Sequence, residues 1–170
     1  MTATLLNIGS GQRRFTPGWH NIDLVSRPGQ VPDILADGAR LPYKDGSVKC
    51  AVLHHVLEHF GCNEGDSMLK ECHRVLEPQG SLIVFVPDLK ALAEAWQKGT
   101  ISSYTYCVNL YGAYQGEESD RHKWGYDYVS LVQAVIKAGS WWMIKPFSWR
   151  HIPGADFACD WWITAVEAIR

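Results

Sequence analysis

The chain has 170 residues, of which 46% are hydrophobic and 20% are charged, and this is the composition of one globular domain. A formal net charge of −2 lacks the basic excess of a protein that binds many phosphates, so we expect no nucleic-acid partner. No apolar run is long enough to span a membrane, and the five cysteines form no C-x-x-C pair. We therefore expect a soluble, cytoplasmic protein with neither a membrane partner nor a disulfide framework.

Short apolar runs separated by turn residues predict buried strands in the first half of the chain. These strands are expected at residues 5–8, 22–25, 33–37, 48–53 and 81–87. Only Lys49 interrupts the fourth run, which favours a strand buried on both faces, as in a parallel sheet. Apolar residues at helical spacing predict a helix from Asp66, its expected N-cap, to Leu76, and a second helix over residues 89–98. Strands that alternate with helices imply a parallel α/β sheet.

The second half begins with an aromatic-rich segment, residues 100–128, that has no clean period. Its aromatic residues include Tyr104, Tyr106, Tyr111, Tyr114, Trp124 and Tyr126. We interpret it as a lid or acceptor-binding insertion within a single domain spanning residues 1–170; the alternative is an insertion that is disordered or only packs. A helix is expected at 128–138, then strands at 141–147 and 161–169. Because no helix separates these two strands, the last one is expected to be antiparallel.

The stretch HHVLEHF contains His55, Glu58 and His59 in the spacing H-x-x-E-H of an inverted zinc-peptidase helix. That motif needs both imidazoles on a well-formed helix. Here it follows a predicted strand directly and meets Gly61 soon after His59, which leaves room for barely one helical turn. We therefore interpret the spacing as coincidental, assign no metal, and expect added zinc or chelator to change neither folding nor activity. The alternatives are partly solvated histidines at a strand end, or histidines that belong to a ligand site.

Small and polar residues follow the first four predicted strands, at the edge where open α/β sheets bind ligands. They are Asn7, Gly9, Ser10 and Gly11, then Asp23, then Asp37 and Gly38, then His54 and His55. Glycines let backbone N–H groups approach a ligand closely, and the carboxylate of Asp23 can accept both hydroxyls of a ribose. Asp23 and Asp37 are also typical of strand-end turns, which is the alternative interpretation.

Four segments together resemble a known family: LLNIGSG, NIDLV, ILADGARLPYKDGSVKCAVLHHVLEHF and ECHRVLEPQGSLIVFVPDL. They are similar to small class I S-adenosylmethionine-dependent methyltransferases. The resemblance implies a mostly parallel, Rossmann-like α/β sheet with helices on both faces and an antiparallel last strand. It also implies S-adenosylmethionine as the cofactor. The cofactor-binding residues would then be Asn7, Gly9, Ser10, Gly11, Asp23, Leu24, Asp37, Gly38, Ala39, His54 and His55.

The chain departs from the family pattern in the first loop. Asn7 stands where the family usually has an acidic residue, and Arg13 replaces a third glycine. Gly9 and Asp23 are 14 positions apart, whereas about 20 are expected when a full helix joins the first two strands. We therefore predict that the first connecting helix is shortened.

The resemblance implies methyl transfer to a small-molecule acceptor, such as a sugar or another hydroxyl-bearing metabolite. A hydroxyl acceptor needs a general base, and His122, in the polar stretch SDRHKWGYD, is our candidate; His55 is the rival. The main alternative is a non-catalytic protein that binds S-adenosylmethionine or S-adenosylhomocysteine, or serves as a scaffold. A dehydrogenase is less favoured because G-x-G-x-x-G is absent.

Overall fold

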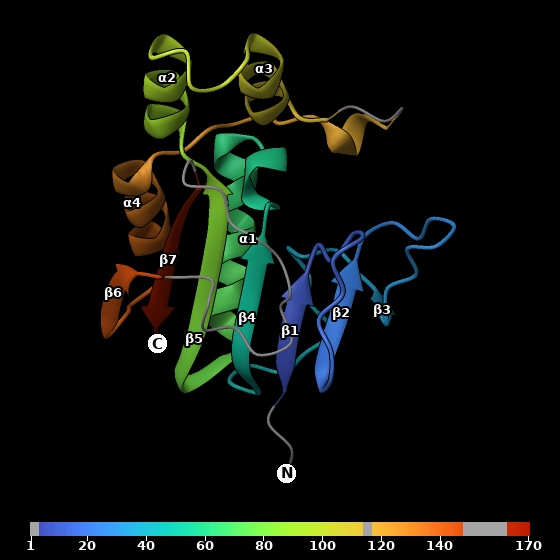
Figure 1. Cartoon of the computed structure of the whole chain (residues 1–170). Coiled ribbons are helices and arrows are strands. Elements are labelled where there is room, and N and C mark those ends of the chain that lie inside the picture. The colour runs from blue at the N-terminus through green and yellow to red at the C-terminus, as the bar shows by residue number, and fades with distance from the viewer. Residues whose placement is uncertain (1–3, 114–116, 148–162) are drawn as a thin grey trace.

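The structure is a computed structural model that describes residues 4–113, 117–147 and 163–170. Within these residues, seven strands form one sheet in the order β3-β2-β1-β4-β5-β7-β6 (Figure 1). β7 is antiparallel to its neighbours β5 and β6, whereas the other neighbouring pairs are parallel. The prediction of a mostly parallel sheet with an antiparallel last strand is confirmed. The strands are β1 (Leu5–Ile8), β2 (Trp19–Asp23), β3 (Ile34–Leu35), β4 (Val48–His54), β5 (Leu76–Pro87), β6 (Met143–Pro146) and β7 (Ile163–Ile169).

The register brings the carboxyl ends of the first strands together. Ile8 at the end of β1 pairs with Ile22 of β2 on one side and with Leu53 of β4 on the other. After β1 the chain adds β2 and β3 on one side of β1, and then crosses to the other side of β1 to form β4. Such a reversal of strand order is the place where open α/β sheets bind ligands. The polar residues that follow these strands therefore share one edge.

The helices occupy one face of the sheet and its carboxyl edge (Figure 1). Buried apolar residues of α1 and α4 pack with each other and with the strands, while α2 and α3 contact each other beyond the carboxyl ends. The helical elements are α1 (Cys62–Val75), α2 (Leu89–Gln97), α3 (Ser103–Tyr111), α4 (Tyr128–Ala138) and the 3-10 turns η1 (Leu57–His59) and η2 (Glu118–Asp120).

The opposite face of the sheet carries a second apolar cluster. Phe15 and Trp19 meet edge to face, with ring centroids 5.1 Å apart, and are buried in the same cluster as Phe85 of β5. Phe15 belongs to the β1–β2 connection, which contains no helix. We expected helices on both faces of the sheet. Within the described residues, the helices that pack on the sheet all lie on one face. The β1–β2 connection is too short to hold a crossover helix, so its aromatic side chains cover this face instead.

Several element boundaries differ from prediction, and one helix was not predicted at all. α1 begins at Cys62 rather than after Asp66, because Gly61 is its N-cap and the Gly61 N–H donates to Glu64 Oε2 at 3.0 Å. β2 ends at Asp23, so Leu24 lies beyond it and is 62% exposed. α3 was not predicted; none of its residues is buried, so the sequence carries no apolar period there.

Some sequence predictions fall outside the described residues. These are the assignment of Tyr114 to the aromatic segment and of Trp161 and Trp162 to the last strand. Among the residues that are described, no helix combines the length and the apolar character needed to cross a membrane.

Candidate functional site

The loop after β1 is shaped by Gly9. This residue has φ +66°, and a Cβ atom there would lie 2.5 Å from Val56 Cγ2. Only glycine fits, because a side chain would be strained by the backbone conformation and would clash with Val56. The loop therefore lies flat against the start of the β4–α1 connection, with Gly9 and Gly11 lining a cavity of about 320 Å³.

Asp23 stands across the same cavity and also holds the loop in place. Its Oδ2 accepts the Gly11 N–H at 2.8 Å, and its Oδ1 accepts the Val25 N–H at 3.1 Å. Asp23 therefore does cap a turn, as the alternative interpretation proposed. A carboxylate has about four lone-pair sites, however, so two hydrogen bonds leave capacity for a ligand.

Most of the predicted cofactor residues line this one cavity. They are Gly9, Gly11, Asp23, Leu24, Asp37, Gly38 and His55. Asp37 Oδ1 accepts the Ala39 N–H at 2.9 Å, and the Asp37 side chain thus forms a local turn. The residues Arg27, Gln30, Val56, His59, Phe60, Met68, Ser119, Asp120 and Lys123 line it as well, and sequence reasoning missed them as cofactor contacts.

Four predicted cofactor residues do not line the cavity: Asn7, Ser10, Ala39 and His54. Asn7 is 1% exposed, and its Nδ2 donates to Arg13 O at 2.7 Å and to Asn21 Oδ1 at 2.9 Å. Asn21 Nδ2 in turn donates to Asp33 Oδ2 at 2.8 Å. An amide can donate where a carboxylate cannot, so the asparagine at position 7 suits a role in holding the short β1–β2 connection.

His54 and His55 point to different surroundings at the end of β4. The ring of His54 is buried, lies 5.2 Å from the Phe85 ring and contacts the Arg13 guanidinium. Burial, aided by the charges of His55 and Arg13, lowers the pKa of His54 to about 2. His55 has φ 57°, uncommon for a residue with a side chain, and its Nδ1 lies 2.9 Å from Glu58 Oε1.

Glu58 is 1% exposed and lies among three histidines. Burial by itself would raise the pKa of this carboxyl, but the hydrogen bond from His55 and the charges of His55, His122 and His59 outweigh burial and lower it. Glu58 is therefore ionised at neutral pH. The sequence motif identified Glu58 and His59, but it contained nothing that pointed to His122.

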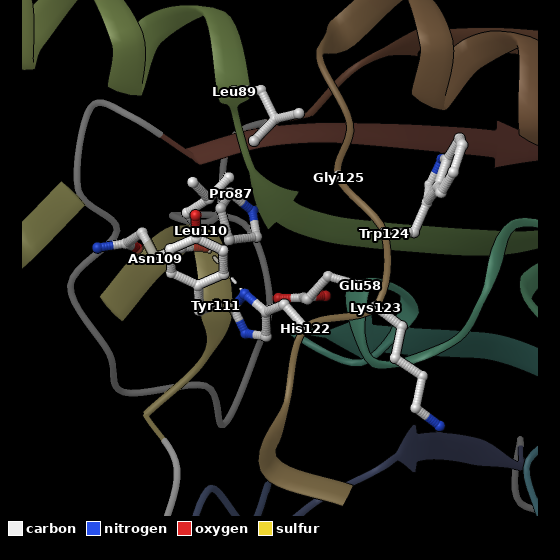
Figure 2. A pocket seen from close by; sticks show the side chains of 10 residues that line it. All are labelled: Glu58, Pro87, Leu89, Asn109, Leu110, Tyr111, His122, Lys123, Trp124 and Gly125. Carbon is white, nitrogen blue, oxygen red and sulfur yellow. Dashed lines mark hydrogen bonds between the residues drawn. The ribbon is translucent and has the colours of Figure 1, made fainter. Parts of the chain in front are cut away.

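His122 faces a second cavity, of about 280 Å³, beside the first. The main-chain N–H of His122 donates to Tyr111 O at 3.0 Å, and the ring atom Nδ1 lies 2.9 Å from Asn109 O. The end of α3 therefore positions the ring. Figure 2 shows His122 and the Glu58 carboxylate pointing toward each other. Burial lowers the pKa of His122, although Glu58 opposes this effect, and the imidazole is neutral at pH 7. Lys123 lines both cavities.

The aromatic segment is joined to the sheet edge by main-chain contacts. Lys123 N–H and Trp124 N–H both donate to Glu58 O, at 2.8 and 3.1 Å. At the end of α3, Gly112 has φ +87°, and a Cβ atom there would lie 2.2 Å from Asp120 O. Only glycine permits this approach. The contacts hold the segment over the carboxyl ends of the strands (Figure 1).

This sheet order, with a glycine loop after β1 and a carboxylate after β2 at the switch point, defines a Rossmann-like methyltransferase fold. Solved structures of methyltransferases share it. A SAM-dependent methyltransferase from Thermotoga maritima aligns with TM-score 0.60 and 17% identity, over 98% of this chain and 81% of that one. One from Archaeoglobus fulgidus aligns with TM-score 0.61 and 11% identity, over 99% and 86%.

A third structure is 1,6-didemethyltoxoflavin-N1-methyltransferase from Burkholderia thailandensis, with bound 1,6-didemethyltoxoflavin and S-adenosylhomocysteine. It aligns with TM-score 0.59 and 14% identity, over 99% of this chain and 71% of that one. No curated protein sequence matches significantly. Residues 6–84 match the family model described as a methyltransferase domain. The chain thus carries a sequence match to the methyltransferase domain and has the fold of the class I S-adenosylmethionine-dependent methyltransferases, whose cofactor is S-adenosylmethionine.

Proposed function

We propose that the protein is an enzyme that transfers a methyl group from S-adenosylmethionine to a small molecule bearing a hydroxyl group, such as a sugar. The observation that carries this proposal is the pairing of two cavities. One joins the ends of β1, β2 and β3, and the other joins His122 and Glu58 to the aromatic segment. Lys123 lines both cavities, so a cofactor and an acceptor could lie side by side.

The first cavity has a donor set that fits the cofactor. Gly9 and Gly11 leave room for its methionine part, Asp23 offers carboxylate oxygens to its ribose, and the turn at Asp37 and Gly38 suits its adenine. A volume of about 320 Å³ lies within the range of ligand pockets. When bound, S-adenosylmethionine supplies a methyl group that is already activated by a sulfonium, so the protein needs mainly to align the acceptor.

His122 is our candidate for the group that takes the acceptor proton. Its Nδ1–H is directed to Asn109 O, which assigns the lone pair to Nε2. A neutral imidazole with a free lone pair is suited to general-base catalysis near neutral pH. His55 is less suited because it lines the first cavity, where we place the cofactor, whereas His122 lines the second.

Calorimetric titration with S-adenosylmethionine, S-adenosylhomocysteine and NADH tests the cofactor assignment. We expect heat with the two sulfur nucleotides and none with NADH; the reverse pattern would contradict the proposal. A screen of hydroxyl-bearing acceptors, read as release of S-adenosylhomocysteine, then separates an enzyme from a non-catalytic binding protein. With an acceptor identified, His122→Asn should lower turnover by about 10²–10⁴-fold at unchanged cofactor affinity.

A further inference from the structure

Three side chains between the two cavities have the composition of a metal site. Glu58, His59 and His122 each offer a ligand atom, and these atoms all lie within 4.8 Å of one another. The rings of His59 and His122 meet edge to face with centroids 4.8 Å apart. His59 lines the first cavity, whereas Glu58 and His122 line the second (Figure 2). The cluster therefore lies where the two cavities approach each other.

The hydrogen bonds of His59 and His122 leave the same ring nitrogen, Nε2, available as a metal ligand in both residues. Nδ1 of His59 lies 3.2 Å from Arg121 O, and Nδ1 of His122 lies 2.9 Å from Asn109 O. A carbonyl can only accept, so each Nδ1 carries a proton, and in the neutral imidazole each Nε2 then carries a lone pair. Histidines that bind metals typically direct their other ring N–H to a carbonyl or carboxylate in this way.

Glu58 supplies the third ligand atom. Its Oε1 accepts from His55 Nδ1 at 2.9 Å, but its Oε2 is buried and has no hydrogen-bond partner among the described residues. A buried carboxylate oxygen without a partner is costly. The cost is removed if a cation binds there, and His55 would then orient the carboxylate from behind.

We propose that Glu58 Oε2, His59 Nε2 and His122 Nε2 form a binding site for a divalent transition-metal ion. Two imidazoles and one carboxylate suit Zn²⁺, Fe²⁺ or Co²⁺, whereas Mg²⁺ and Ca²⁺ prefer oxygen ligands. Three protein ligands leave a position for a further ligand, as in catalytic zinc sites. The ion binding does not rest on the proposed methyl transfer.

The sequence interpretation assigned no metal, because His55 and His59 cannot share a helix. The folded chain uses a different pair. His55 bonds to Glu58 Oε1, and His122, from the aromatic segment, joins Glu58 and His59 in the cluster. With an ion bound, the Nε2 lone pair of His122 would be a ligand, so His122 could not be the general base in that form.

Titration of the chelator-treated full-length protein with Zn²⁺, and with Co²⁺ followed by visible absorption, tests the site. We expect one ion per chain and a Co²⁺ spectrum typical of low coordination number. Glu58→Gln, His59→Asn and His122→Asn should each abolish this binding. Asparagine preserves a donor near the position of Nδ1, and thus the bond to the backbone carbonyl, while it removes Nε2.

The matched control is His20→Asn, which removes an exposed imidazole outside the cluster and should bind the ion as wild type does. His55→Asn, which can keep both the positive φ and the bond to Glu58, should bind more tightly than His55→Gly by about 10–100-fold. Melting curves without metal establish that each variant is folded. The site is refuted if folded wild type binds no stoichiometric ion, or if the cluster variants bind as well as His20→Asn. Failure of cofactor binding would leave this result unaffected.

Discussion

At the scale of single residues, one side chain of the first cavity, that of Asp23, has both a structural role and a ligand-facing position. Asp23 closes the loop after β1 by accepting the Gly11 N–H and also caps the turn at Val25. The loop must be in place before the cavity can bind a ligand, so the same carboxylate shapes the cavity and faces it. A polar residue at a strand end can thus be structural and functional together.

Replacement of Asp23 should therefore affect both binding and the loop. We expect Asp23→Ala to weaken S-adenosylmethionine binding by about 1.5–3 kcal/mol, the range for lost hydrogen bonds to a charged group. Calorimetric titration measures the effect, and Asp45→Ala, at an exposed carboxylate that pairs with Arg74, is the control. Unchanged affinity in Asp23→Ala would mean that the carboxylate serves the turn alone.

At the scale of elements, an ion pair joins two segments that line the first cavity. Arg27, from the β2–β3 connection, pairs with Asp120 of η2 at 3.1 Å and donates to Ser119 Oγ at 3.2 Å. All three residues line the cavity. The aromatic segment is thus joined to the sheet edge from one side by Arg27 and from the other by the main-chain contacts at Glu58.

Removal of this ion pair should speed cofactor exchange. The Arg27 and Asp120 side chains are 31% and 14% exposed, and a partly exposed pair contributes about 1 kcal/mol at most. We expect Arg27→Ala to raise the dissociation rate of S-adenosylhomocysteine by up to about fivefold, as measured by stopped-flow displacement. Lys98→Ala breaks an exposed pair on α2 and should leave the rate unchanged. Equal rates in the two variants would show that the Arg27 contact does not restrain exchange.

Over the whole molecule, the two faces of the sheet respond differently to pH. The face covered by α1 and α4 has a largely apolar core, whereas the other face contains the buried imidazole of His54 beside Phe85. Folding keeps His54 neutral, because burial lowers its pKa from 6.5 to about 2. In the unfolded chain the same imidazole is protonated at mildly acidic pH.

The unfolding free energy should therefore fall as the solution is acidified below pH 6.5. Above that pH, His54 is neutral in both states; below it, the unfolded chain binds a proton that the folded chain excludes. The contribution of His54 is up to about 1.4 kcal/mol per pH unit. His122, whose pKa is also lowered, adds a change of the same sign. Urea unfolding at pH 7 and pH 5.5 should show a smaller loss in His54→Gln than in wild type, and equal losses would contradict the low pKa.

Local patterns in the sequence were sufficient for most of the sheet and for part of the site. The apolar runs predicted β1, β4 and the carboxyl-terminal part of β5, since buried parallel strands are continuously apolar. The residues that follow strands predicted an edge site, and Gly9, Asp23 and Asp37 do line one cavity. These features depend on residues that are close along the chain, and hydrophobic periodicity reflects the arrangement of such residues.

Contacts between distant segments were decided by the tertiary structure. No periodicity identifies α3, because none of its residues is buried, and yet the end of α3 orients His122. Glu58 and His59 belong to a motif whose other histidine, His55, bonds to Glu58 Oε1 and is not part of the cluster, which folding completes with His122 instead. A motif describes residues that are close along the chain, whereas a site is made by residues that are close in space, and main-chain bonds such as that from His122 to Tyr111 O determine which residues meet.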